Sequence, residues 1–176
     1  MKALVVYESM FGNTEEVARA IADGLRTRME VDLHEVSQAP QQITEPVDLV
    51  VVGGPTHAFS MSRPSTRAQA LQQGARQGQE ALGLREWLAH LRKGPHAELV
   101  AAFDTRVQKA RWLPGSAAKR AVKVARALGY APAGKQSFYV VDTSGPLVPG
   151  ELDRAEGWGR ELATTMATRT GGRHVH

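Results

Sequence analysis

Short apolar runs and longer amphipathic segments alternate along the chain. Residues 2–7, 47–54 and 98–105 are runs dominated by apolar side chains, many of them β-branched or aromatic, and residues 135–143 are a further predicted strand. Continuous runs of this length are typical of strands that are buried on both faces of a sheet. Residues 29–36 instead alternate between apolar and polar side chains, which predicts a strand nearer a sheet edge. We therefore expect five strands.

The segments between these runs carry a helical period. In residues 14–28 the apolar side chains recur at spacings of three and four and form one stripe, made of Val17, Ala18, Ile21, Ala22 and Leu25. Further helices are predicted over three segments, residues 84–91, 116–129 and 151–168. In the second of these, Ser116 is a candidate N-cap and Gly129 a candidate C-terminal stop. Residues 55–78 show no clear period, and we expect an irregular segment there.

Strands that alternate with helices form parallel sheets with helices on both faces. Five strands and four or five helices in 176 residues predict a three-layer, doubly wound α/β sheet. We expect a single domain over residues 1–169 and a flexible C-terminal tail over residues 170–176. In doubly wound sheets, ligands bind beyond the carboxyl ends of the strands, where the strand order reverses. The loops after residues 7, 54, 103 and 141 are therefore the candidate functional region.

The composition excludes several kinds of functional site. The chain has no cysteine, which excludes disulfides, iron–sulfur clusters and thiolate catalysis. The six histidines do not have the spacing of a zinc site, and no Gly-x-Ser-x-Gly nucleophile motif occurs, so we expect no metal and no hydrolase triad. No signal peptide and no apolar run of about 18 residues is present, so we expect a cytoplasmic protein that binds no membrane. The net charge of +4 is a small excess, and without a nucleic-acid motif we expect no nucleic-acid binding.

The first candidate loop, YESMFGNT at residues 7–14, joins an apolar strand to the start of a helix. Free backbone N–H groups and the helix dipole make an anion site there without any lysine or arginine. The Ser9 and Thr14 hydroxyls and the Asn13 amide add further donors. Gly12 permits a positive φ angle and a close approach of the backbone to a ligand. These features indicate a phosphate site. The alternative is an ordinary helix N-terminus, at which Thr14 only caps the helix and Gly12 only allows the chain to turn.

The segment SMFGNTEE resembles the phosphate-binding loop of the flavodoxins, Thr/Ser-x-Thr-Gly-x-Thr, which holds the phosphate of FMN. Phe11 stands where many flavodoxins have a hydroxyl, but an aromatic residue at this place is similar to the flavodoxin modules of flavodiiron proteins. The segment VVVGGPTHAF resembles the second loop of the family, Gly-x-Pro-Thr-His/Tyr. The resemblance implies a flavodoxin-like sheet with strand order 2-1-3-4-5, FMN as the cofactor, and electron transfer as the function.

Carried over to this sequence, the resemblance implies two groups of cofactor-binding residues. The phosphate would be held by Ser9, Met10, Phe11, Gly12, Asn13 and Thr14. The flavin ring would be surrounded by Pro55, Thr56, His57, Ala58, Phe59, Asp104, Thr105 and Arg106. His57 or Phe59 would supply a stacking face, and Arg106 would lie near the flavin atoms N1 and O2, where negative charge accumulates on reduction. Electron transfer needs no catalytic acid or base, and we expect Trp112 to pack in the core.

Two other functions are compatible with these residues. One is an FMN-dependent NAD(P)H or quinone reductase, with its second substrate held under residues 60–78. The other is a flavin-free interaction module that keeps the fold. Arg63, Arg67, Lys109 and Arg111 are expected to form a basic rim around the pocket. Such a rim would favour an acidic redox partner protein or the phosphates of NADPH.

Overall fold

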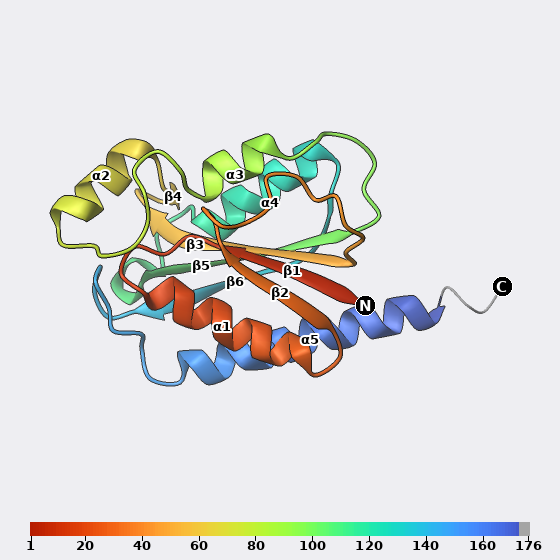
Figure 1. Ribbon diagram of the computed structural model, residues 1–176. Coiled ribbons are helices and arrows are strands. Elements are labelled where there is room, and N and C mark those ends of the chain that lie inside the picture. Colours follow the sequence, from red (N-terminus) through yellow and green to blue (C-terminus); the bar gives the residue numbers. More distant parts are fainter. Residues whose placement is uncertain (173–176) are drawn as a thin grey trace.

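Five parallel strands form the centre of the molecule, in the order β2-β1-β3-β5-β6 (Figure 1). The computed structural model describes residues 1–172. The parallel strands are β1 (Lys2–Tyr7), β2 (Glu30–Glu35), β3 (Leu49–His57), β5 (Leu99–Val107) and β6 (Ala131–Val140). A short strand, β4 (Ser60–Met61), pairs antiparallel with the end of β3. The predicted doubly wound α/β fold and its strand order 2-1-3-4-5 are confirmed.

Helices cover both faces of this sheet (Figure 1). Helices α1 (Asn13–Arg26) and α5 (Glu151–Gly172) lie on one face. Helices α3 (Leu84–His90) and α4 (Ala117–Leu128) lie on the other. Helix α2 (Pro64–Gln72) follows β4, beside the end of the sheet at which β3 finishes. The three layers place the loops that follow β1, β3, β5 and β6 at one edge of the sheet.

The alternation of side chains along the strands divides the apolar core into two parts. Val5 and Val51 face α1 and α5, whereas Val6 and Val52 face α3 and α4. The apolar stripe predicted on α1 is buried in the first part. The residues predicted on one face of α3 are buried in the second part: Leu84, Trp87, Leu88 and Leu91. Periodicity therefore identified which helix faces are covered.

The ends of α4 also follow the sequence prediction. The Ser116 hydroxyl accepts a hydrogen bond from the backbone N–H of Lys119 at 3.2 Å, which is the contact of an N-cap. Gly129 ends the helix with a φ of 104°, in the left-handed region that favours glycine. These local contacts fix where the loop between β5 and α4 finishes.

Two features differ from the sequence prediction. Residues 55–78, expected to be irregular, contain the end of β3, strand β4 and helix α2. Helix α2 has no apolar stripe, because its buried residues are Arg67 and Ala70, and so its period was not visible. Trp112 is 81% exposed rather than in the core, because the loop after β5 carries it onto the surface. Its ring there is covered by the Arg111 guanidinium, 4.7 Å from the ring centroid.

Helix α5 is longer than predicted and runs through Gly172. It therefore includes the first residues of the predicted tail, and residues 173–176 lie outside the described part of the chain. No helix within residues 1–172 combines the length and the apolar character that a membrane crossing requires.

Two glycines of α5 provide a matched test of helix packing. A Cβ at Gly159 would lie 2.3 Å from the carbonyl oxygen of Ile21 in α1, whereas a Cβ at Gly157 would meet nothing within 4 Å. We expect Gly159→Ala to lower the free energy of unfolding by about 1–3 kcal/mol, because α1 and α5 must move apart. Gly157→Ala should raise it by about 0.5–1 kcal/mol, because alanine favours a helix over glycine. Urea unfolding measures both values, and equal effects of the two substitutions would contradict the packing described here.

Candidate functional site

A hollow opens at the carboxyl ends of the central strands, between the loops that follow β1, β3, β5 and β6. Its wall is formed by Met10, Phe11, Asn13, Thr14, Pro55, Thr56, His57, Thr105, Arg106, Val107, Val140 and Thr143. Most of the predicted site residues thus come together. The predicted residues outside the wall are Ser9, Gly12, Ala58, Phe59 and Asp104. The hollow lies where the strand order reverses, between β1 and β3, as the sequence predicted.

Its own hydrogen bonds and a left-handed glycine fix the conformation of the loop between β1 and α1. Gly12 has a φ of 93°, a left-handed conformation that glycine adopts without strain. The buried Ser9 hydroxyl accepts hydrogen bonds from the backbone N–H groups of Gly12 (3.1 Å) and Glu15 (3.4 Å). Five further backbone N–H groups of the loop find no hydrogen-bond partner among residues 1–172, those of Ser9, Met10, Phe11, Asn13 and Thr14. These free donors lie at the positive end of the α1 dipole, so the loop can bind an anion.

A pair of buried hydroxyls links the first loop to the third. Thr14 Oγ1 lies 2.7 Å from Thr105 Oγ1, and both side chains are buried. Each hydroxyl has one proton to donate, and their mutual hydrogen bond uses only one of the two. One hydroxyl proton therefore remains available at the wall of the hollow. Thr105, predicted beside the flavin ring, lines the hollow, and its hydroxyl contacts the predicted phosphate loop at Thr14.

The second loop is a tight hairpin. Strand β3 ends at His57 and returns as β4 through Ala58 and Phe59, whose φ angles are 46° and 63°. Non-glycine residues adopt this left-handed conformation uncommonly, and two in succession make a strained turn. Phe59 is 53% exposed at the tip. At the base of the hairpin, the Thr56 hydroxyl accepts a hydrogen bond from the N–H of Ala117 at 3.0 Å, which joins the hairpin to the start of α4.

His57 presents a neutral ring to the hollow. Its Nδ1 lies 3.1 Å from the hydroxyl oxygen of Thr66 in α2. Burial, followed by the positive charge of Arg67, lowers the pKa of His57 below its ordinary value. The imidazole is therefore uncharged at neutral pH, and its face is available for stacking.

Asp104 belongs to the base of α4 rather than to the wall of the hollow. Its side chain is fully buried, and its Oδ2 accepts a hydrogen bond from the N–H of Ala118 at 2.9 Å. Burial raises the pKa of this carboxyl, while hydrogen bonds to Ala118, Ser116 and Ser137 act in the opposite direction. Only the backbone of Asp104 is thus in a position to contribute to a ring site at this edge.

Arg106 lines the hollow and also holds the third loop in place. Its Nη2 donates hydrogen bonds to the carbonyl oxygens of Ala110 (2.6 Å) and Leu113 (3.1 Å). The loop then passes close to the hairpin, because a Cβ at Gly115 would lie 2.5 Å from the carbonyl oxygen of Phe59. The exposed Phe59 at the hairpin tip and the third loop, which carries Trp112, are therefore neighbours.

The loop after β6 contributes residues that sequence reasoning missed. Val140 and Thr143 lie in the wall, and a Cβ at Gly145 would lie 2.6 Å from Oδ1 of Asn13. This loop was among the candidates by its place after a strand, but none of its residues was predicted in the site. A further contact comes from the N–H of Gln77, which donates to the carbonyl oxygen of Met10 at 3.2 Å. No local pattern around residue 77 indicated that it would reach the phosphate loop.

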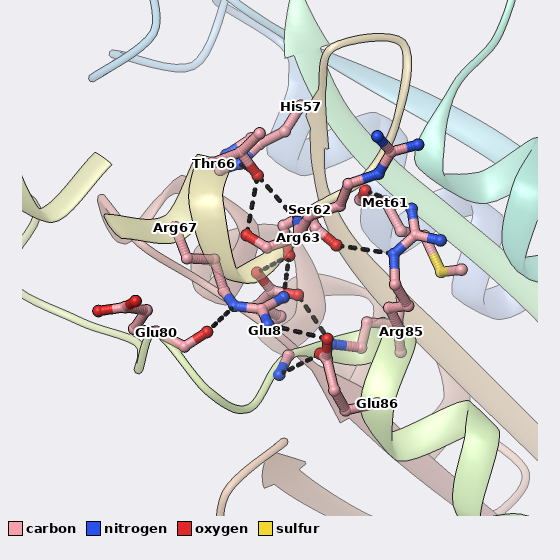
Figure 2. Close-up of polar contacts among 12 residues, drawn as sticks. Glu8, His57, Met61, Ser62, Arg63, Thr66, Arg67, Glu80, Arg85 and Glu86 are labelled. Carbon is pink, nitrogen blue, oxygen red and sulfur yellow. Dashed lines mark hydrogen bonds and ion pairs between the residues drawn. The ribbon is translucent and has the colours of Figure 1, made fainter. Parts of the chain in front are cut away.

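A buried charged network lies behind the site (Figure 2). Glu8, next to Ser9, accepts hydrogen bonds from the Ser62 hydroxyl and from the N–H of Leu84 (2.8 Å). Arg67 Nη1 donates to Ser62 Oγ at 2.8 Å. Its Nη2 lies 2.9 Å from Glu86 Oε1, an ion pair that lacks hydrogen-bond geometry. Arg67 was expected at the basic rim, but it is 0% exposed, because the Ser62 hydroxyl, the carbonyl oxygen of Glu80 and the charge of Glu86 hold it inside.

The ionisation of Glu8 depends on this network. Burial raises the pKa of Glu8 above its ordinary value, whereas the hydrogen bonds from Ser62 and Leu84 and the charge of Arg67 lower it. Both carboxylate oxygens accept hydrogen bonds from donors, which is the pattern of an ionised carboxylate. The hydrogen bonds from Ser62 and Leu84, followed by the charge of Arg67, therefore favour the ionised form of Glu8.

Comparison with known proteins agrees with this geometry. A sequence model of the flavodoxin family matches residues 5–83, which include the first and second loops of the site. The comparison with curated proteins gave no match.

Among solved structures, the fold is similar to that of a flavodoxin from the domain Archaea, with a TM-score of 0.62 at 19% identity, over 95% of this chain and 99% of that chain. Flavodoxin 1 from Bacillus cereus gives a TM-score of 0.64 at 18% identity, over 93% and 98%. A diflavin flavoprotein A3 from Nostoc sp. gives 0.54 at 18% identity, over 99% and 98%. At these identities the structures share the fold. The sequence match over residues 5–83 and the fold shared along the rest of the chain make this protein similar to the flavodoxin family.

Proposed function

We propose that this protein binds FMN non-covalently in the hollow and functions in electron transfer. The observation that carries the proposal is the loop of residues 9–14, in which Gly12 is left-handed and the N–H groups of Phe11, Asn13 and Thr14 are free. A phosphate dianion fits this donor set, because backbone donors and the helix dipole favour negative charge. No lysine or arginine is needed within the loop.

The remaining wall suits a flavin ring. Pro55, Thr56, His57, Thr105 and Arg106 combine apolar surface, a neutral imidazole and a cation around one hollow. FMN would supply the redox chemistry, and the protein would supply binding, orientation and electrostatics. We further propose that electrons are exchanged with a redox protein that has an acidic surface. Phe59 and Trp112 are exposed on two loops that line the hollow, and with the cations Lys109 and Arg111 they support a partner of this kind.

The direct test is titration of the purified protein with FMN, followed by flavin absorbance and fluorescence. FMN should bind with quenched fluorescence, and riboflavin should bind at least about tenfold more weakly, because it lacks the phosphate that the loop would hold. Equal affinity for FMN and riboflavin would contradict the phosphate site. No change in either signal at saturating FMN would overturn the cofactor proposal and leave the fold.

Arg106 should make the bound flavin easier to reduce. A cation about 6 Å from a unit negative charge contributes about 2–3 kcal/mol at an effective dielectric constant of 20, and partial exposure reduces this. We expect Arg106→Gln, which removes the charge, to shift the midpoint potential by about 40 mV to more negative values. Redox titration of the FMN-loaded protein measures the shift, and Arg111→Gln, at the exposed Trp112, is the control. An unchanged or less negative potential would count against this role of Arg106.

A further inference from the structure

Three arginines from three elements gather beside the hairpin. Arg63 lies between β4 and α2, Arg85 lies in the first turn of α3, and Arg120 lies in the first turn of α4. Arg85 is fixed in place, because its Nε donates to the carbonyl oxygen of Ser62 at 3.0 Å and its Nη2 to that of Met61 at 2.9 Å. Figure 2 shows the guanidinium groups of Arg63 and Arg85 on the same side of the network, away from Glu8 and Arg67.

These charges repel one another. Burial, followed by the charges of Arg63 and Arg120, lowers the pKa of Arg85 below its ordinary value. Within residues 1–172, none of the three arginines forms an ion pair. The nearby carboxylate, Glu86, is turned inward, where its Oε1 faces Arg67 and its Oε2 accepts a hydrogen bond from the N–H of Gly83. The cluster therefore holds positive charge without a counterion from the described chain.

The position of Arg120 adds a second unfavourable electrostatic interaction to this repulsion. The first turn of α4 carries Lys119 and Arg120 and no acidic residue. Cations at a helix N-terminus are unfavourable, because they face the positive end of the helix dipole. Neither the fold nor the proposed FMN site requires positive charge here. An anion bound between the three guanidinium groups would offset both the mutual repulsion and the dipole term.

We propose that Arg63, Arg85 and Arg120 form a second anion site, which binds a phosphate group of a small ligand of the nucleotide class. The site is distinct from the loop of residues 9–14 and does not depend on FMN being bound. Guanidinium N–H groups donate to the oxygens of a phosphate. Arg85 is fixed by two carbonyl oxygens through Nε and Nη2, so it loses little freedom on binding, and its Nη1 has no partner within residues 1–172. Three cations beside one short hairpin favour a compact oxyanion over the spread-out charges of an acidic protein surface.

The location suggests how such a ligand would relate to the flavin hollow. The Thr56 hydroxyl in the wall accepts the N–H of Ala117 at the start of α4, the helix that carries Arg120. The hairpin of residues 57–60 thus separates the arginine cluster from the hollow. A ligand held here by its phosphate would extend across the exposed Phe59 toward the mouth of the hollow.

The test is calorimetric titration with pyrophosphate in a low-salt buffer free of phosphate. To exclude binding at the first loop, all proteins carry Asn13→Asp, which places a carboxylate in that loop. Arg63→Gln/Arg120→Gln should bind pyrophosphate about tenfold or more weakly than the parent. Arg126→Gln, on the same helix as Arg120, is the matched control and should bind as the parent does. Arg85 is left intact, because it holds the hairpin.

The same proteins distinguish the possible ligands. NADPH binding tighter than pyrophosphate would indicate a nucleotide as the source of the phosphate, and equal binding would indicate free phosphates. Equal pyrophosphate affinity in the double variant and in the control would overturn the proposal. Binding of a polyglutamate peptide that needs Arg63 and Arg120, without any binding of pyrophosphate, would also overturn it in favour of an acidic protein. FMN titration of Arg63→Gln/Arg120→Gln with Asn13 intact tests the cofactor site separately, and we expect unchanged affinity there.

Discussion

Replacement of Arg67 by methionine should lower the free energy of unfolding by about 3–5 kcal/mol at pH 7. Arg67 is fully buried between the Ser62 hydroxyl, the carbonyl oxygen of Glu80 and the carboxylate of Glu86. Its loss leaves the buried Glu8 without a nearby cation, and removal of one partner from a buried charge network carries a cost of this size. Methionine fills a similar volume, so the lost stability reflects the missing charge and hydrogen bonds rather than a cavity. Urea unfolding of the variant and of Arg76→Met, an exposed arginine of the same segment, measures the effect.

The pH dependence of this loss has a definite sign. Burial raises the pKa of Glu8 in the folded state above its ordinary value, and removal of Arg67 raises it further. A carboxyl with a raised pKa in the folded state binds more protons there than in the unfolded chain. Stability therefore increases as the pH falls from the folded pKa toward the ordinary value of 4.5. The deficit of Arg67→Met should thus shrink between pH 7 and pH 5.

A double variant separates charge from packing. Glu8→Gln/Arg67→Met removes the uncompensated carboxylate, and we expect it to be more stable at pH 7 than Arg67→Met alone and to lack the recovery at low pH. If the single variant loses the same stability at pH 5 and pH 7, the ionisation of Glu8 does not set the cost. In that case Arg67 stabilises the segment of residues 60–86 by its shape and hydrogen bonds alone.

The network also shows why the sequence predicted the strands and helices better than the segment of residues 55–86. Strands β1, β3 and β5 are continuous apolar runs, and α1 has a stripe with a period near 3.6, so local pattern decides their structure. Helix α2 is held by Arg67, a side chain whose burial depends on Glu8 and Glu86, which are distant in sequence. No local pattern distinguishes a buried arginine from a solvated one. The same limit misplaced Trp112, because an aromatic residue in a loop has no period to show which way it faces.

The candidate site, too, was predicted where its chemistry is local and missed where it depends on distant residues. The loop of residues 9–14 was predicted because its chemistry is local: a strand end, a glycine, small donors and a helix start. Thr143 and Gln77 reach this region only through the fold, and the hydroxyl contact of Thr14 with Thr105 joins the start of α1 to β5, which are far apart in sequence. Sequence identified the loops that form the site, and the structure was needed to show which side chains of those loops meet.

Asn13→Asp should weaken FMN binding by about 100-fold or more while leaving the fold intact. The side chain of Asn13 lies in the wall of the hollow, at the first residue of α1. A carboxylate there would stand beside the phosphate dianion, and repulsion at such short range costs about 3 kcal/mol or more at an effective dielectric constant of 20. In the free protein the same carboxylate faces the positive end of the helix dipole, which is favourable by about 0.3–1 kcal/mol.

The substitution therefore separates binding from stability, because its two effects have opposite signs. Thermal unfolding without ligand should show a variant at least as stable as the wild type, whereas FMN titration should show the large loss. Riboflavin, which has no phosphate, should bind both proteins equally, and Asn13→Ala should lose far less FMN affinity than Asn13→Asp. If riboflavin affinity falls as much as FMN affinity, the phosphate does not bind beside Asn13. The free N–H groups at the start of α1 would then have no role in phosphate binding.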